Sequence, residues 1–236
     1  MIYGLVVAGG IGQRMGSDIP KQFLKIRHKS IISYTVEVFL DHTDIEKVIV
    51  LVPEDWIDFT KDLFMRDFGE MEKLVVTAGG KLRNDTIMNG IKYIKENYVY
   101  DDTTTLVTHD AVRPFVTKEI IDRNIEALKE YDSCDTVIPA TDTIVESLDH
   151  QVISDVPNRA NLYQGQTPQS FKMKKFEELY TSLTEDEKNI LTDAAKVFVI
   201  KGEKVALVEG STFNIKMTHP SDLDFANSII GRKNEK

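Results

Sequence analysis

The chain has 236 residues, of which 42% are hydrophobic and 28% are charged, so it contains enough apolar material for a buried core. Its 38 acidic side chains outnumber the 29 basic ones, and the net charge of −9 argues against a protein that mainly binds nucleic acid. The chain has one cysteine, no signal-peptide pattern and no apolar run of the roughly 18 residues that a membrane span needs, so we expect a cytoplasmic protein without disulfides or a membrane partner.

The first half of the chain alternates short runs of β-branched residues with segments of helical period. The runs predict strands at 2–8, 47–53 and 73–80. The periodic segments predict helices at 30–41, 55–68 and 85–97. Asp55 would be an acid in the first turn of the second helix, where a negative charge is favourable. Strands that alternate with helices indicate a parallel sheet.

The second half continues the alternation. Strands are predicted at the start of 104–115, at 134–140 and at 204–210. Helices are predicted at 118–131, 171–183, 191–201 and 220–230. We therefore predict an α/β fold with a Rossmann-like, doubly wound and mostly parallel sheet. The chain has no internal repeat or low-complexity linker, which favours a single domain over residues 1–236.

The alternation breaks at residues 139–170. This stretch contains two short β-like runs, at 142–147 and 150–156, followed by polar sequence without helical period. We interpret it as a β-arm that leaves the sheet, either for dimerisation or as a flap over an active site. A surface hairpin without a role is the alternative.

Residues 6–16, VVAGGIGQRMG, place glycines directly after a predicted strand, and PKQF follows at 20–23. Glycine lets backbone amides approach a ligand closely and bind anionic oxygens. The dinucleotide fingerprint is only half matched, because Gly10 and Gly12 fit but Met15 occupies the third glycine position. Arg14 and Lys21 add two cations in loop sequence, which suits a triphosphate under attack. Either cation alone would indicate a solvated surface charge.

The glycine segment resembles that of sugar-nucleotide and polyol-phosphate nucleotidyltransferases, and PKQF resembles their cytidylyltransferase branch. Further matching blocks follow in order along the chain: AGGKLRNDTI at 78–87, THDAVRPF at 108–115, NRANLYQGQTPQSF at 158–171, LTDAAK at 191–196 and FNIKMTHPSDL at 213–223. These blocks span almost the whole chain. The resemblance implies the nucleotidyltransferase type of sheet.

Two relatives share these blocks, one specific for 2-C-methyl-D-erythritol 4-phosphate and the other for D-ribitol 5-phosphate. HDAVRPF, YQGQTPQSF and DTIVES resemble the ribitol enzyme more closely. The methylerythritol enzyme is expected to have a second acid where this chain has Ala194. The sequence therefore favours transfer of a cytidylyl group from CTP to D-ribitol 5-phosphate, giving CDP-ribitol and pyrophosphate for teichoic-acid or capsule polymers. Transfer to 2-C-methyl-D-erythritol 4-phosphate is the alternative.

The resemblance also implies a set of nucleotide-binding residues in the two glycine segments and after the strand at 104–110. They are Val7, Ala8, Gly9, Gly10, Gly12, Gly79, Gly80, Arg83, Asn84, Asp85, Thr86 and Ala111. A β-turn with an asparagine helix cap is the structural alternative for AGGKLRNDT. Asp110, placed in a loop after a strand, is the predicted Mg²⁺ ligand, because a carboxylate there suits a hard cation that bridges phosphates. Its alternative role is to pair with Arg113.

The acceptor phosphate needs cations of its own. The resemblance implies Lys216 and Arg159 as catalytic cations, beside Arg14 and Lys21. Arg113, Thr143 and Thr167 are lesser candidates around the acceptor. Family enzymes are dimers in which the arm reaches the neighbouring subunit, so we expect a homodimer in which Arg159 serves the partner's site.

A catalytic base at His109 and two other classes of function are less favoured by the sequence. His109 is taken as structural, because an anionic phosphate nucleophile needs no base. A nicotinamide-dependent reductase is disfavoured by the missing third glycine and by the lack of an obvious tyrosine and lysine pair. A nucleotide-binding regulator without catalysis is disfavoured by the presence of both Arg14 and Lys21. A reductase that makes ribitol 5-phosphate is a candidate partner.

Overall fold

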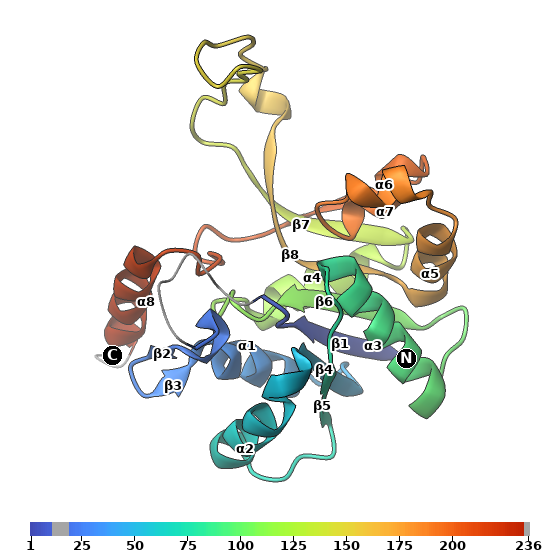
Figure 1. Ribbon diagram of the computed structural model, residues 1–236, viewed down its shortest axis with the longest axis vertical. Coiled ribbons are helices and arrows are strands. Elements are labelled where there is room, and N and C mark those ends of the chain that lie inside the picture. Colours follow the sequence, from blue (N-terminus) through green and yellow to red (C-terminus); the bar gives the residue numbers. More distant parts are fainter. Residues whose placement is uncertain (11–18, 234–236) are drawn as a thin grey trace.

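A seven-stranded sheet in the order β5-β4-β1-β6-β8-β7-β9 forms the centre of the molecule (Figure 1). The computed structural model describes residues 1–10 and 19–233. The strands are β1 (Ile2–Val7), β4 (Lys47–Val52), β5 (Leu74–Ala78), β6 (Thr105–Asp110), β7 (Ser133–Pro139), β8 (Tyr163–Lys172) and β9 (Ala206–Glu209). Strand β8 is antiparallel to both neighbours, and all other pairs in this sheet are parallel. The predicted mostly parallel α/β fold is confirmed.

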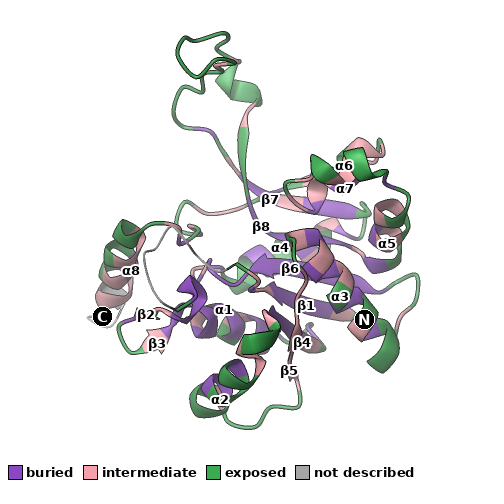
Figure 2. Cartoon of the chain, viewed as in Figure 1, coloured by how far each residue is buried: buried purple, intermediate pink, exposed green. Residues whose placement is uncertain are grey.

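Helices cover both faces of the sheet. They are α1 (Ile31–Leu40), α2 (Ile57–Phe68), α3 (Arg83–Asn97), α4 (Lys118–Ala127), α5 (Met173–Thr181), α6 (Glu185–Asn189), α7 (Ala195–Ile200) and α8 (Pro220–Lys233). Helices α1, α2 and α4 pack on one face of the sheet, and α3, α5 and α7 pack on the other. Consecutive residues of β1 enter opposite layers, Leu5 toward α3 and Val6 toward α1, which explains its uninterrupted apolar sequence. Figure 2 shows that β1 is buried along most of its length.

The predicted boundaries hold well for α1, whose first turn is capped by Ser30, because the Ser30 hydroxyl accepts a hydrogen bond from the Ser33 amide. Helix α4 ends earlier than predicted, since its C-cap Leu128 packs with Cys134 and Val208 in a separate apolar cluster. Asp55 lies in a short 3-10 helix, η3 (Glu54–Trp56), that precedes α2 rather than in α2 itself.

The structure adds elements that the sequence pattern did not predict. A two-stranded ribbon, β2 (Lys25–Ile26) and β3 (Lys29–Ser30), lies between a 3-10 helix, η2 (Lys21–Phe23), and α1. Helix α6 is set by a capping box in which Thr184 and Glu187 exchange side-chain and backbone hydrogen bonds. Among the described helices, none has both the length and the apolar character to cross a bilayer.

The predicted excursion at 139–170 is shorter than expected. Residues 140–162, here called the arm, project away from the sheet between β7 and β8 (Figure 1). The two β-like runs predicted within it form no extended strands and meet in a single bridge between Glu146 and Asp155. Residues Tyr163–Lys172 form β8, which lies between β6 and β7 in the sheet.

Strand β8 escaped prediction because its sequence, YQGQTPQSFK, is polar although most of it is buried. Each buried polar side chain has a hydrogen-bond partner. Gln166 donates to the Ser211 carbonyl, Gln169 to the Asp135 carboxylate and Ser170 to the Asn124 side chain. These bonds make burial tolerable where apolar periodicity is missing.

Candidate active site

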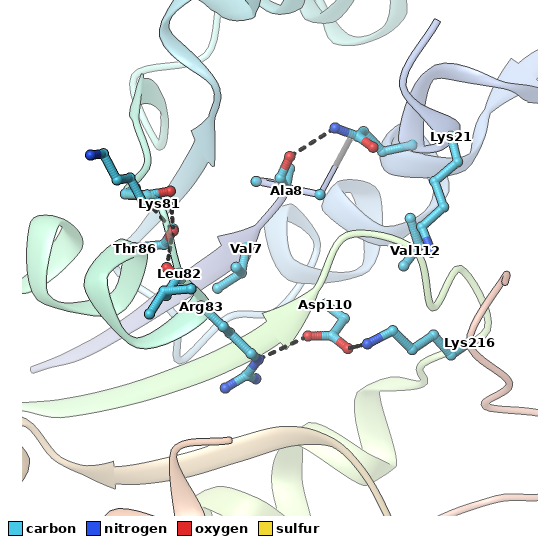
Figure 3. A pocket seen from close by; sticks show the side chains of 14 residues that line it. Val7, Ala8, Lys21, Lys81, Leu82, Arg83, Thr86, Asp110, Val112 and Lys216 are labelled. Atoms are coloured by element: carbon cyan, nitrogen blue, oxygen red, sulfur yellow. Dashed lines mark hydrogen bonds and ion pairs between the residues drawn. The ribbon is translucent and has the colours of Figure 1, made fainter. Parts of the chain in front are cut away.

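A pocket of about 530 Å³ opens at the carboxyl ends of β1 and β6, where open parallel sheets bind ligands (Figure 3). Its walls come from five places in the chain that are far apart in sequence. They are residues 7–10, residues 21 and 22, residues 80–83 with Thr86, residues 110 and 112, and Lys216.

Asp110, the last residue of β6, lies at the centre of this pocket and faces three cations. Arg83 Nε is 3.2 Å from its Oδ1, Lys216 Nζ is 2.9 Å from its Oδ2, and Arg113 Nε is 3.9 Å from Oδ2. Burial would by itself raise the pKa of Asp110, but the charges of Arg83 and Lys216 outweigh it and hold the pKa well below its usual range. The carboxyl group is therefore ionised, and it ends a strand rather than lying in a loop.

Several nitrogen donors around Asp110 have no hydrogen-bond acceptor among the described residues. Both terminal nitrogens of Arg83, and Nε of Arg113, are buried without a hydrogen-bond partner among the described residues. Buried donors without acceptors are costly, so their presence indicates a site that an oxygen-rich ligand completes. Preorganised cations of this kind stabilise charge that develops on a phosphate.

Lys21 lies at the side of the pocket in η2 and is only 9% exposed. Its Nζ donates to the Met217 carbonyl at 3.0 Å, next to Lys216 in the chain. The neighbouring Gln22 donates to the Ala8 carbonyl at 2.7 Å and fixes η2 against the end of β1 (Figure 3). Lys21 is thus part of the packed structure and not a loop side chain, which corrects the expectation from sequence.

The second glycine segment follows β5. The Gly80 amide donates to Thr86 Oγ1 at 3.0 Å, which folds the segment onto the first turn of α3. A Cβ on Gly80 would lie 2.5 Å from the Cβ of Asp85, so only glycine fits there. The Asp85 carboxylate accepts hydrogen bonds from the Leu82 amide and the Tyr180 hydroxyl, so it caps α3 rather than facing the pocket.

The structure brings most of the predicted nucleotide-binding residues to the pocket: Val7, Ala8, Gly9, Gly10, Gly80, Arg83 and Thr86 line it. Gly79, Asn84, Asp85 and Ala111 do not line it, and Ala111 is fully buried with its amide bonded to the Val7 carbonyl. The predicted residues Gly12 and Arg14 lie outside the described part of the chain. Gln22, Lys81, Leu82 and Val112 line the pocket without having been singled out, although all four belong to the motifs PKQF, AGGKLRNDT and THDAVRPF.

His109 has a structural role, as the sequence analysis expected. Its Nε2 is 3.1 Å from the Arg113 carbonyl, which can only accept, so Nε2 carries the proton. Its Nδ1 then accepts from the Thr167 hydroxyl at 2.9 Å. Burial lowers the pKa of His109 to about 4, so the ring is neutral.

Thr167 packs below Asp110 and does not line the described pocket. It is buried, and its hydroxyl oxygen also accepts a hydrogen bond from the Asp110 amide at 3.2 Å. Together, Thr167 and His109 position the backbone of Asp110 and Arg113. The expected role of Thr167 at the acceptor stays a prediction.

The two predicted residues of the arm lie away from the pocket of their own chain. Thr143 is exposed, and Arg159 is exposed with one terminal nitrogen bonded to the Thr141 carbonyl at 2.7 Å. Neither lines the described pocket. Within one chain, the structure therefore brings together Lys21, Lys216, Arg113 and Asp110, but not Arg159 or Thr143.

Comparisons with known proteins agree over nearly the full length of the chain. The family model described as 2-C-methyl-D-erythritol 4-phosphate cytidylyltransferase matches residues 2–232. The 4-diphosphocytidyl-2C-methyl-D-erythritol synthase of Anaerococcus prevotii DSM 20548 is 25% identical, with a TM-score of 0.80 over 98% of this chain and 96% of that one. The 2-C-methyl-D-erythritol 4-phosphate cytidylyltransferase of Francisella tularensis is 27% identical, with a TM-score of 0.79 over 96% of this chain and 98% of that one.

Proposed function

Because the chain belongs to the 2-C-methyl-D-erythritol 4-phosphate cytidylyltransferase family, we propose that its pocket binds CTP and transfers the cytidylyl group to a polyol phosphate. The observation that carries this proposal is the ionised Asp110, surrounded by Arg83, Arg113 and Lys216 beside two glycine segments. The glycine segments offer backbone amides to the nucleotide, and the cations suit two phosphates that must approach each other.

In the proposed reaction, an oxygen of the acceptor phosphate attacks the α-phosphorus of CTP. A new P–O bond forms, the bond from the α-phosphorus to the bridging oxygen breaks, and pyrophosphate leaves with that electron pair. The nucleophile is already anionic, so no base is required, and the neutral, fully hydrogen-bonded His109 agrees with this. Catalysis would come from positioning and from charge stabilisation by Lys21 and Lys216.

We propose Mg²⁺ as the cofactor, with Asp110 as its protein ligand. Mg²⁺ in nucleotide sites commonly takes one or two carboxylates, several waters and phosphate oxygens, so the single carboxylate that lines the described pocket is enough. Lys216, which contacts Asp110 Oδ2, is 45% exposed on its side chain and is free to turn toward a phosphate. When bound, the metal would supply positive charge to the nucleotide phosphates.

For the acceptor, the comparisons favour 2-C-methyl-D-erythritol 4-phosphate over the D-ribitol 5-phosphate that the sequence analysis preferred. Ribitol 5-phosphate stays the second candidate because of Ala194. This residue is fully buried, and its amide donates to Gln169 Oε1 at 3.2 Å. An acid at position 194 would bury a second carboxyl group beside Asp193, so the methylerythritol pattern needs a different environment here.

The test is to offer the purified protein CTP and Mg²⁺ with each acceptor in parallel and to measure pyrophosphate and the nucleotide product. Glycerol 3-phosphate serves as a short acceptor, and ATP and GTP as control nucleotides. We expect CTP to be used well and ATP or GTP poorly. Turnover of one polyol phosphate identifies the acceptor, and no pyrophosphate with any of them contradicts the proposed function.

A further inference from the structure

A row of polar residues crosses three strands beside the pocket. Gln169 of β8 pairs with Thr108 of β6 on one side and with Asp135 of β7 on the other. Directly opposed residues of antiparallel strands point to the same face of a sheet, and so do residues two apart on one strand. Asp135 and Asp110 therefore lie on the same face, the one covered by α3 and α7.

The carboxylate of Asp135 is held at one oxygen and open at the other. Gln169 Nε2 donates to its Oδ1 at 3.1 Å, while Gln169 Oε1 accepts from the Ala194 amide at 3.2 Å, so the glutamine is fixed at both ends. Oδ2 accepts no hydrogen bond from the described residues. Gly165 lies next to this oxygen, and a Cβ at that position would be 3.5 Å from Oδ2. The glycine thus leaves Oδ2 accessible.

Charged groups connect Asp135 to the centre of the pocket. Burial, helped by the charge of Asp193, raises the pKa of Asp135 to about 7, although the hydrogen bond from Gln169 and the charges of Arg83 and Arg113 act in the opposite direction. Arg83 is also the partner of Asp110, and its two terminal nitrogens have no partner among the described residues. The Arg83 guanidinium group therefore interacts electrostatically with both Asp110 and Asp135. Its two terminal nitrogens can donate to a ligand that extends from one carboxylate to the other.

A further unsatisfied polar atom lies at this end. Asn84 is only 6% exposed, and its Oδ1 has no hydrogen-bond partner among the described residues. Its Nδ2 donates to the Asp193 carbonyl at 3.4 Å. Asn84 does not line the described pocket, so it lies behind the neighbouring Arg83 rather than in contact with a ligand.

The sheet order separates the two halves of the site. The glycine segments follow β1 and β5, on one side of Asp110, whereas Asp135 lies on β7, on the other side. In the proposed reaction the nucleotide and the acceptor meet at Asp110. With the nucleotide over β1 and β5, the acceptor would lie over β8 and β7.

We propose that Asp135 binds hydroxyl groups of the acceptor polyol through Oδ2, with Arg83 of the pocket wall as the neighbouring donor. This inference rests on the proposed function and deepens it, because it assigns the part of the site that recognises the polyol rather than its phosphate. Oδ2 has lone pairs to accept one or two hydroxyl groups, while Oδ1 is held by Gln169. An acceptor that uses this carboxylate therefore has free hydroxyls distant from its phosphate.

The experiment compares the KM for the acceptor with the KM for CTP in three variants. Asp135→Asn removes the charge at constant shape, and Asp135→Ala removes the whole group. Gly165→Ala adds a methyl group at van der Waals distance from Oδ2 and crowds the approach to it. Asp102→Asn is the matched control, since Asp102 is an exposed carboxylate just before β6, at the amino end of that strand.

We expect both Asp135 variants to raise the KM for the acceptor roughly ten- to a hundredfold, as for loss of one or two hydrogen bonds to the hydroxyl groups of the acceptor. The KM for CTP and the melting temperature of Asp135→Asn should change little, and Gly165→Ala should raise the acceptor KM severalfold. The control should match the wild type. If Asp135→Ala fails to fold, the other two variants decide.

Different failures are distinguishable. A wild type that makes no pyrophosphate with any polyol phosphate contradicts the proposed function and this inference with it. An active wild type whose acceptor KM is unchanged in the Asp135 variants contradicts the inference alone. A rise in the KM for CTP instead would place the carboxylate at the ribose of the nucleotide and also overturn it.

Discussion

Lys216 Nζ lies 2.9 Å from Asp110 Oδ2 and joins the segment before α8 to the carboxyl end of β6. The contact is between a half-exposed cation and a buried carboxylate, so the lysine can leave Asp110 without exposing an apolar core. The Lys216 side chain therefore has a defined position beside Asp110 and can move from it toward a phosphate. In the proposed reaction it is the cation best placed to move with the transferred charge.

We predict that Lys216→Ala lowers kcat by about a hundred- to a thousandfold, the usual cost of losing one donor to a developing anionic centre. The free energy of unfolding should change by less than about 1 kcal/mol, because the lysine side chain is half exposed. Steady-state kinetics and denaturant unfolding measure the two effects. Lys61→Ala, at an exposed lysine of α2, is the control. Near-full activity of Lys216→Ala would exclude a catalytic role.

Lys21 should respond differently, because it is buried and donates to the Met217 carbonyl. We predict that Lys21→Ala lowers kcat and also destabilises the fold by about 1–3 kcal/mol, since it removes a buried hydrogen bond and the packed side-chain stem. Lys21→Met keeps most of the stem, so it should recover part of the stability but none of the activity. Equal activity in Lys21→Met and the wild type would contradict a role in charge stabilisation.

The buried His109 should make the protein less stable in mild acid. Its pKa is lowered to about 4 by burial, whereas in the unfolded chain it is near 6.5, so the unfolded state takes up the proton first as the pH falls. This contribution to stability is complete above about pH 6.5 and declines toward pH 4 by about 3 kcal/mol. In His109→Gln, unfolding curves across this range should show a shallower decline than the wild type. An identical pH dependence would contradict a neutral buried ring.

The arm is predicted to complete the site of a second subunit, as the resemblance implies. Its apolar side chains are largely exposed, with Leu148 79%, Val152 65% and Ile153 61% accessible, and only one bridge joins its two halves. Such a segment needs a surface to pack against, and a twofold-related copy supplies one. We therefore expect a homodimer in which Arg159 acts on the partner's acceptor.

Subunit mixing tests this prediction. Lys21→Ala and Arg159→Ala should each be inactive alone, and activity should partly return after exchange, because a mixed dimer contains one site with both lesions and one with neither. No recovery despite proven exchange would show that Arg159 acts in its own subunit. Sedimentation as a monomer would reject the homodimer.

The sequence by itself determined the framework of the fold and the segments of the pocket. The strands β1 and β4 are apolar runs because they are buried on both faces, and this signal is local and strong. Glycine segments and an aspartate at the ends of such strands must meet, because carboxyl ends of parallel strands share one edge of the sheet. The pocket contains both.

The tertiary structure alone decided what each polar residue does there. Strand β8 has no apolar pattern, and its burial depends on partners such as Ser211, Asp135 and Asn124 from other elements. For the same reason, only the structure shows that Thr167 holds the Asp110 backbone. The sequence around Asp135 did not indicate a functional residue, because its surroundings come from β8, α3 and the segment before α7. Hydrogen bonds and charges between distant segments set these roles, and a linear pattern does not contain them.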